Sequence, residues 1–357
     1  MADEQKPTPS LEISGSRQFT AWLAEQKTSL AFTTYQAGKL FLIGLKEDGR
    51  LSIFERTFNR CMGLAVEDNT LYMSSLYQLW RFENLLQPGG LYQEYDRLYV
   101  PQVSWITGDL DVHDLVITDN KELNFVNTLF SCVSKVSEQY SFEPVWKPDF
   151  ISKLAAEDRC HLNGLAARDG KARYVSAISR SDVSEGWRDR RKDGGVVIDI
   201  DSNEILCEGL SMPHSVRWYR DTLYVLNSGA GYFGKIDMDT GKFEAICFCP
   251  GYARGLNFIG DFALIGLSKS RSKSFTGLSL DDELKKRDGQ SRCGLIVVDL
   301  RSGDLVHSLN IEGLVEEIYD VVALPGVMRP CAIGTVSDEI RRIISIPPGS
   351  EIMADKN

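Results

Sequence analysis

Residues 161–177 of the chain read HLNGLAARDGKARYVSA. Two short, largely apolar runs flank the dipeptide Asp169-Gly170, and glycine supplies the positive φ that a tight hairpin turn requires. The first run starts at the polar residue Asn163, which is followed by glycine, leucine and alanine. This stretch therefore predicts two antiparallel strands joined by a tight turn, with a polar side chain at the start of the first strand.

The same unit recurs along the chain at a fairly regular period. Similar segments begin at six positions, which are separated by 51, 50, 51, 40 and 65 residues. We call their first residues the lead residues: Met62, His113, Asn163, His214, Arg254 and Tyr319. Repeats of this length that are rich in short strands are typical of β-propeller blades, since one small sheet buries its faces only against the next. We therefore predict an all-β propeller domain over residues 16–350, between a disordered tail at 1–15 and a C-terminal tail at 351–357.

The blade count follows from the remaining strands. Three repeats continue into a second hairpin, in which Asp199, Asp237 and Asp299 stand before a turn: VIDIDSNEIL, KIDMDTGKFE and VVDLRSGDLV. Residues 31–58 read as further strands that lack a lead residue of their own. We expect them to pair with strands near 318–346 and so to close the ring from both ends of the chain. This arrangement predicts six blades, with seven as the alternative.

Segments outside the repeat predict helices and loops. Residues 16–26, SRQFTAWLAEQ, predict a short helix with Ser16 as its N-cap and with Phe19, Trp22 and Leu23 on one face. Insertions interrupt the repeat at 83–108, 180–193 and 269–292, and the last of them contains a second helical stretch, SLDDELKKR. Such insertions lie on the faces of a propeller, where they often wall a pocket.

Composition excludes several classes of protein. The 357 residues carry a formal net charge of -10, which argues against a nucleic-acid partner, because such proteins need a basic face. The sequence holds no apolar run near the roughly 20 residues of a membrane span and no secretory signal pattern. We therefore expect a cytoplasmic protein without a membrane partner. The eight scattered cysteines fit reduced thiols better than a disulfide framework.

The lead residues are the candidate functional site. The innermost strand of each blade runs along the central axis, so the lead column is expected to face the channel. A purely structural column would be small or apolar, yet this one contains two of the four histidines in the chain together with Asn163 and Arg254. Two interpretations remain open: polar side chains that line a water-filled hole, or a binding site for a small molecule.

The residue types indicate what such a site would do. His113 and His214 are the candidate catalytic residues, since imidazole serves as a general acid or base near neutral pH, and Asp111 is expected on the same strand face as His113 to support its ring. Arg254 would clamp an anionic group. The full set of candidate ligand contacts is Met62, Asp114, His161, Asn163, Arg254 and Tyr319.

A divalent metal ion is the competing occupant of the channel. His113, Asn163 and His214 would offer it two imidazoles and a carbonyl oxygen, which suit a transition metal better than calcium. A bare cation beside Arg254 would be repelled unless an anion lay between them. The residue types therefore favour an anion over a metal.

The hairpin quoted at the start resembles the inner hairpin of six-bladed propellers in the gluconolactonase and senescence-marker, strictosidine-synthase-like and NHL groups. The lactonase resemblance implies a channel metal site of Glu, Asn and Asp ligands, with Asn163 in the place of the Asn. Here His113, His214 and Arg254 stand where carboxylates would be expected, so calcium-dependent lactonase activity is doubtful. The strings TYQAGKLFLIG, DVHDL, EDRCHLNGLA, GLSMPHSVRWY and FCPGYARGL also resemble a bacterial family of propeller-like proteins of unestablished function.

These observations predict that the channel binds a small polar, anionic metabolite. The channel histidines would act on it in a hydrolase, isomerase or lyase reaction, among which the residues do not choose. The alternative is a non-catalytic scaffold for a protein partner, contacted through Trp105, Trp146 and Trp187 in or near the insertions.

Overall fold

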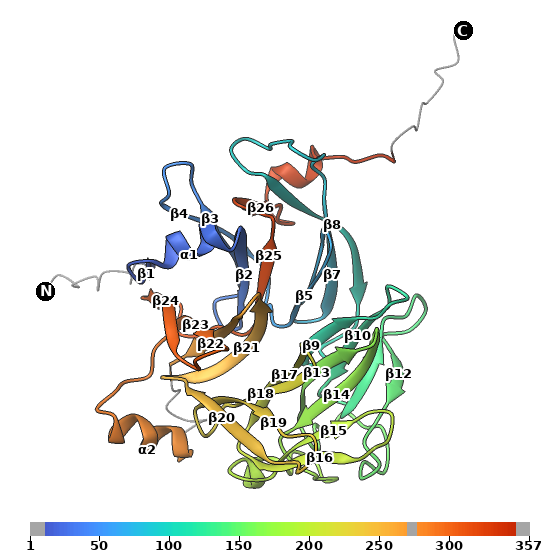
Figure 1. The fold of residues 1–357 in the computed structure, drawn as a ribbon. Coiled ribbons are helices and arrows are strands. Elements are labelled where there is room, and N and C mark those ends of the chain that lie inside the picture. Colours follow the sequence, from blue (N-terminus) through green and yellow to red (C-terminus); the bar gives the residue numbers. More distant parts are fainter. Residues whose placement is uncertain (1–10, 270–276, 348–357) are drawn as a thin grey trace, which may run out of the picture.

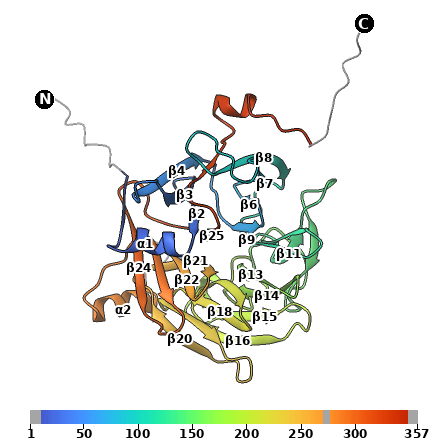
Figure 2. The same ribbon diagram turned by 45° about the horizontal axis from the view of Figure 1, so that its top comes forward.

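The computed structural model describes residues 11–269 and 277–347. In these residues the strands form six sheets around a central axis (Figures 1 and 2), and the fold is a six-bladed β-propeller. The sequence-based prediction of six blades is therefore confirmed. Most neighbouring strands are antiparallel and consecutive in the chain, as short hairpin turns require.

Each blade runs from an innermost strand at the channel to an outermost strand at the rim. Blade 1 contains β25 (Val321–Pro325), β2 (Thr28–Thr34), β3 (Lys39–Leu45) and β4 (Leu51–Thr57). Blade 2 contains β5 (Leu64–Glu67), β6 (Thr70–Ser74), β7 (Gln78–Asn84), β8 (Arg97–Ile106) and the edge strand β26 (Pro330–Ala332). Blade 3 contains β9 (Val112–Ile117), β10 (Leu123–Asn127), β11 (Cys132–Lys135) and β12 (Glu143–Trp146).

The other half of the ring consists of blades 4, 5 and 6. Blade 4 contains β13 (Leu162–Arg168), β14 (Lys171–Ala177), β15 (Gly195–Asp199) and β16 (Ile205–Leu210). Blade 5 contains β17 (Pro213–Tyr219), β18 (Thr222–Asn227), β19 (Tyr232–Ile236) and β20 (Phe243–Phe248). Blade 6 contains β21 (Tyr252–Ile259), β22 (Phe262–Ser268), β23 (Gly294–Asp299), β24 (Leu305–Glu312) and the edge strand β1 (Glu12–Gly15).

Blade 1 closes the ring with strands from both ends of the chain. Its innermost strand, β25, pairs antiparallel with β2, so that Ala31 lies opposite Val322. The expected pairing of residues 31–58 with a C-terminal strand is therefore present. At the N-terminus, β1 pairs with β24, so the ordered fold begins before the predicted boundary at residue 16. The rest of the predicted N-terminal tail, residues 1–10, and the C-terminal tail at 351–357 lie outside the described residues.

Two short α-helices accompany the ring in the part of the chain that the structure describes. Helix α1 (Phe19–Glu25) buries Phe19, Trp22 and Leu23, as its apolar spacing predicted. The predicted Ser16 cap is wrong: Gln18 is the N-cap residue, and the Ser16 hydroxyl instead accepts a hydrogen bond from the Ser308 N–H on β24. The second predicted helix is α2 (Ser279–Lys286). Short 3-10 turns span Arg188–Arg190 and Asp338–Arg341.

The apolar core lies between the blades rather than at the axis. One cluster joins blades 3 and 4 through residues such as Val133 and Val175, and another joins blades 5 and 6 through Phe233 and Ile265. Each sheet therefore buries both faces against its neighbours, which is why the repeat is stable only as a ring.

Buried hydroxyl groups link every blade to the next. A Ser or Thr at the end of each second strand donates a hydrogen bond to a backbone carbonyl at the start of the next inner strand, and we call these contacts the hydroxyl clasps. The donors are Thr33, Ser74, Thr128, Ser176, Ser228 and Ser268, and the acceptors are the carbonyls of Met62, Val112, Leu162, Pro213, Ala253 and Ile318. The clasps hold the starts of the inner strands together, and the lead residues are located there.

Candidate functional site in the central channel

The six inner strands begin at the same mouth of the channel, which brings the lead residues into one layer. Met62 and Tyr319 lie just before their strands, and the other four lie within the first three strand residues. Five of the six lead residues are at most 8% exposed, and Arg254 is partly buried. The predicted column therefore exists as a buried layer, in which Met62 is the apolar member.

A second layer lies two residues before the leads. It consists of Arg60, Asp111, His161, Met212, Tyr252 and Glu317. Arg60, Asp111, His161 and Met212 have φ between 48° and 54°, a left-handed conformation that is uncommon for side chains other than glycine. The chain therefore turns sharply before these inner strands, and simple strand alternation does not apply at this point.

Ring contacts make the two layers continuous. His161 packs its ring between Trp187, at 4.2 Å between centroids, and His113, at 4.8 Å. His113 then contacts Tyr319 at 5.7 Å. On the other side of the channel, the Arg254 guanidinium lies 5.2 Å from the ring centroids of both Tyr319 and Tyr252, and Tyr252 contacts His214 at 5.3 Å. The three channel histidines therefore belong to one cluster.

His113 and His214 share one kind of hydrogen bond, and the Nδ1 of His113 also lies 2.9 Å from the Thr128 hydroxyl. In each ring Nδ1 lies 2.8 Å from the backbone carbonyl two residues earlier, of Asp111 and Met212 respectively, so Nδ1 carries the proton. Burial, reinforced by nearby cationic groups, lowers the pKa of His113 to about 4 and that of His214 well below its usual value. Both rings are thus neutral near pH 7, and each presents a bare Nε2 that accepts hydrogen bonds.

Asp111 does not support His113 in the predicted way. Its carboxylate oxygen lies 3.8 Å from His113 Nδ1, beyond hydrogen-bond range, and its other oxygen lies 3.5 Å from the Arg60 guanidinium. The left-handed turn at Asp111 is the reason, because it turns the backbone carbonyl toward the imidazole. The prediction of a carboxylate-supported His113 is therefore wrong.

The carboxylate-supported imidazole is His161 instead. Asp158 Oδ2 lies 2.8 Å from His161 Nδ1 and accepts a second hydrogen bond, also 2.8 Å long, from the Trp187 indole N–H. Burial alone would raise the pKa of Asp158, but the interactions with His161 outweigh it and lower this pKa. Sequence reasoning missed Asp158 because it precedes the repeat, and missed Trp187 as a channel residue because it comes from the 180–193 insertion.

Arg254 is less available to an anion than the sequence indicated. Its guanidinium lies 3.9 Å from the carboxylate of Glu317, which is 2% exposed and also accepts a hydrogen bond from the Gln36 N–H at 2.6 Å. Glu317 therefore offsets the positive charge of Arg254. It stands two residues before Tyr319, just as His161 stands before Asn163, so extending that offset to every repeat would have found it.

Three buried polar groups of the lead layer have no hydrogen-bond partner within the described protein. They are the Nε2 of His214, the amide nitrogen of Asn163 and the hydroxyl of Tyr319. Their residues are 3%, 3% and 5% exposed and come from three different blades. Burial raises the pKa of Tyr319 well above its usual value, so its hydroxyl remains a donor. Buried polar groups normally have partners, so this layer has unused capacity for hydrogen bonds.

Asp114, a candidate ligand contact, lies in a different layer. Its carboxylate accepts two hydrogen bonds from Arg217, at 2.5 and 3.0 Å, and two from the N–H groups of Leu115 and Leu165. Asp320 occupies the equivalent place in blade 1 and lies 3.7 Å from the same guanidinium. These three charged side chains connect the inner strands to one another, and sequence reasoning missed Arg217 because it lies three residues beyond its lead.

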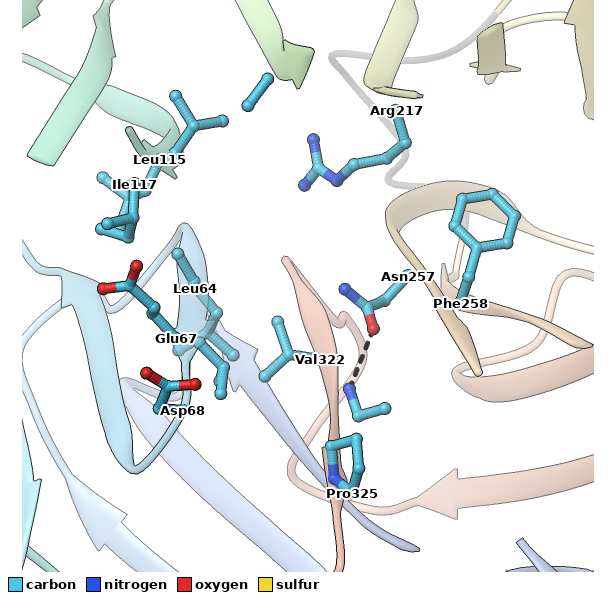
Figure 3. Close-up of a pocket in the computed structure, with 15 residues that line it drawn as sticks. Leu64, Glu67, Asp68, Leu115, Ile117, Arg217, Asn257, Phe258, Val322 and Pro325 are labelled. Carbon is cyan, nitrogen blue, oxygen red and sulfur yellow. Dashed lines mark hydrogen bonds between the residues drawn. The ribbon is translucent and has the colours of Figure 1, made fainter. Parts of the chain in front are cut away.

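A cavity of about 610 Å³ opens at the opposite end of the inner strands. Aliphatic side chains such as Leu64, Leu115 and Val322 form its walls, and Arg217 points into it (Figure 3). Arg217 already donates to Asp114 and to the carbonyls of Leu165, Val216 and Leu256. The polar group at the floor of this cavity is thus engaged within the protein, in contrast to those of the lead layer.

The proposed metal ligands His113, Asn163 and His214 stay a prediction. In residues 11–269 and 277–347, no group of three or more His, Cys, Asp or Glu side chains is placed to hold a metal ion. The proposed set of His113, Asn163 and His214 offers two Nε2 lone pairs and one amide. The positive charge of Arg254 lies in the same cluster, and it already lowers the pKa of both histidines.

The three tryptophans of the scaffold hypothesis pack inward. Trp105 packs against the core between blades 2 and 3, and Trp146 donates a hydrogen bond to Asn203 and packs against the core of blades 3 and 4. Trp187 is only 8% exposed and belongs to the channel cluster. These side chains therefore serve the fold or the channel in this structure.

The fold defines a six-bladed β-propeller in which buried polar side chains gather at the starts of the inner strands. Within that class, the chain belongs to the family described as "Domain of unknown function (DUF4915)", whose model matches residues 17–333. No curated protein matches the chain in sequence. In the described residues, no helix is long and apolar enough to cross a membrane.

Several solved structures resemble the chain at low sequence identity. A chain in the crystal structure of a nidogen/laminin complex is 10% identical, with a TM-score of 0.52 over 84% of this chain and 99% of that one. A protein of unknown function from Bacteroides caccae is 9% identical, with a TM-score of 0.48 over 83% and 98%. Virginiamycin B lyase from Staphylococcus aureus, in a catalytically inactive form with quinupristin, is 9% identical, with a TM-score of 0.40 over 84% and 99%. The first of these similarities, with its TM-score of 0.52, supports the propeller architecture and nothing further.

Proposed function

We propose that the protein binds a small polar molecule in the lead layer of its central channel. The observation that carries this proposal is the set of three buried, unpartnered polar groups on His214, Asn163 and Tyr319. A neutral His214 Nε2 accepts a hydrogen bond, whereas the Asn163 amide and the Tyr319 hydroxyl donate. A matching molecule therefore carries both a hydroxyl or amine donor and an oxygen acceptor.

Water would satisfy some of these groups, and this is the competing interpretation. The layer differs from an ordinary wet channel because histidine and tyrosine rings and the Arg254 guanidinium pack against one another around it. Such contacts hold the donors and acceptors in fixed positions, which favours selective binding over general hydration. His113 and His214 are neutral near pH 7 and would contact the bound molecule as hydrogen-bond acceptors.

The test is a search for ligands by thermal shift with purified protein, followed by calorimetry on the hits. In Tyr319→Phe the ring contacts remain and only the hydroxyl is lost, so affinity is expected to fall roughly 3- to 10-fold, the worth of one hydrogen bond. Tyr92→Phe is the matched control, since Tyr92 bonds Glu339 away from the channel. Equal affinities in both variants would refute the proposal.

Elemental analysis of the same protein addresses the metal alternative. A stoichiometric divalent ion that disappears in the His113→Ala/His214→Ala double variant would replace the hydrogen-bonding site by a metal site. We further propose a cytoplasmic location, which the eight free cysteines support because thiols stay reduced there.

A further inference from the structure

The cavity at the opposite end of the inner strands has the properties of a second binding site, separate from the lead layer. Its volume of about 610 Å³ lies within the range of roughly 300 to 1,000 Å³ that small-molecule sites occupy. Aliphatic side chains of blades 1, 2 and 3, such as Val322, Leu64 and Leu115, form one side (Figure 3). Arg217 of blade 5 and Asn257 of blade 6 lie on the other side. A molecule that fits this cavity has an apolar body and a polar group at one end.

This division into two sides arises from one column of the repeat, three residues after the leads. Five of its six residues line the cavity, and two of those five are the polar residues Arg217 and Asn257. The other four blades have only alanine or valine at this place: Ala65, Val116, Ala166 and Val322. The repeat therefore does not require a polar side chain here, and blades 5 and 6 depart from it together.

Asn257 is the polar group of the cavity with unused capacity for hydrogen bonds. Its side-chain oxygen accepts a hydrogen bond from the Ala323 N–H at 3.1 Å, which fixes the orientation of the amide. Its amide nitrogen has no hydrogen-bond partner among the described residues and is turned toward the open space of the cavity (Figure 3). The amide therefore offers N–H donors to an oxygen atom of a ligand.

The charge of Arg217 does not make this cavity a site for an anion. The guanidinium donates two hydrogen bonds to Asp114, at 2.5 and 3.0 Å, and lies 3.7 Å from Asp320. Two carboxylates thus surround one cation, and a third carboxylate on a ligand would be repelled.

A cation also gains little in this cavity. Glu67 and Asp68, at its mouth, lie 3.4 and 3.7 Å from the Lys121 ammonium group, and the Asp68 side chain is 83% exposed, so water screens its charge. Farther inside, the Arg217 guanidinium would repel a second cation. The cavity therefore favours a ligand without charge.

Beyond the function proposed for the lead layer, we propose that this cavity binds a small, neutral, apolar molecule that carries a carbonyl oxygen, as ketones, esters and amides do. The oxygen accepts a hydrogen bond from the Asn257 amide, and the apolar body packs against Leu64, Leu115 and Val322. The two sites use different residues at opposite ends of the inner strands, so either one can fail experimentally while the other stands.

Methyl NMR of the full chain tests both the place and the class of ligand. The probes are adamantyl methyl ketone, adamantane carboxylate and adamantylmethylamine, which share one apolar cage and differ in the polar end. The ketone is expected to shift the methyl signals of Leu64, Leu115 and Val322, and to bind at least about 10-fold more tightly at pH 7 than either charged probe. Unchanged methyl signals up to the solubility limit of the ketone would overturn the proposal. A charged probe that binds as tightly as the ketone would overturn the ligand class.

Asn257→Asp tests the hydrogen-bond donor. Aspartate keeps an oxygen for the Ala323 N–H and lacks the amide N–H groups, so the affinity for the ketone is expected to fall roughly 3- to 10-fold. Asn203→Asp is the matched control, because the Asn203 oxygen accepts from the Trp146 indole away from the cavity. Equal ketone affinities in these two variants would overturn the role of Asn257. The NMR experiment uses the wild-type chain and gives its answer even where Asn257→Asp fails to fold.

Discussion

Single residues in the channel show how the surroundings change the chemistry of one side-chain type. His113 and His214 are buried against carbonyls and stay neutral, whereas His161 is held by a carboxylate and stacked on tryptophan. The three lie in one cluster, yet their environments separate their roles. Residue type alone made His113 and His214 the candidate catalytic pair, and their burial makes them hydrogen-bond acceptors first.

The lowered pKa of His113 has a consequence for acid stability. In the unfolded chain His113 takes up a proton as the pH falls below about 6.5, the usual pKa of histidine. In the folded chain its pKa is about 4, so it stays neutral until the pH approaches that value. Its stabilising contribution is therefore complete above pH 6.5 and is lost as the pH falls to about 4. We expect His113→Gln to remove acid sensitivity on the order of 3 kcal/mol over this window.

Urea unfolding at pH 7.0, 6.0, 5.0 and 4.5 measures this effect. His307→Gln is the comparison variant, since His307 lies partly exposed on the outer strand β24. A His113→Gln protein that loses stability between pH 7.0 and 4.5 as steeply as the wild type would show that His113 is protonated in the folded state.

At the scale of elements, the starts of the inner strands are held by side-chain hydroxyls as well as by the sheets. Ser176 illustrates the clasp: its hydroxyl accepts from the Gly164 N–H at 2.9 Å and donates to the Pro213 carbonyl at 3.3 Å in the next blade. A Cβ on Gly164 would lie 2.6 Å from the backbone nitrogen of Val216, so glycine allows the two blades to approach closely.

Removal of one clasp is expected to weaken the whole fold. Ser176→Ala leaves a buried N–H and a buried carbonyl without this partner, which costs about 1 to 3 kcal/mol in the free energy of unfolding. Ser202→Ala, in an exposed turn of the same blade, is expected to change it by no more than about 0.5 kcal/mol. Chemical denaturation of both variants makes the comparison, and equal stabilities would show that the clasp contributes little.

The whole molecule depends on contacts that cross the channel. Arg217 from blade 5 binds Asp114 of blade 3, the Leu165 carbonyl of blade 4 and the Leu256 carbonyl of blade 6, and it lies near Asp320 of blade 1. Burial and the neighbouring carboxylate of Asp114 raise the pKa of Asp320 to about 7, whereas the Arg217 guanidinium acts in the opposite direction. Arg217 therefore stabilises the two buried carboxylates.

Arg217→Met is therefore expected to destabilise the protein by about 3 to 5 kcal/mol, because it leaves two buried carboxylates without their partner. Arg220→Met removes an exposed ion pair with Asp261 and is expected to cost no more than about 1 kcal/mol. Melting temperatures of the two variants test this difference. The outcome that contradicts it is a melting temperature of Arg217→Met close to that of Arg220→Met.

The repeat in the sequence was sufficient for the architecture, for the ring closure by strands from both ends and for the lead column. A propeller is built from local hairpins whose apolar runs and turns recur, so short stretches of sequence are enough to predict these properties. The partners of each lead residue were decided only by the tertiary structure. The left-handed turn at Asp111 gave His113 a carbonyl in place of a carboxylate, and ring closure placed Glu317 against Arg254. An insertion supplied Trp187 to the pair of Asp158 and His161. Such contacts join residues from different blades, and a local sequence pattern does not predict which side chains of different blades come into contact across the axis.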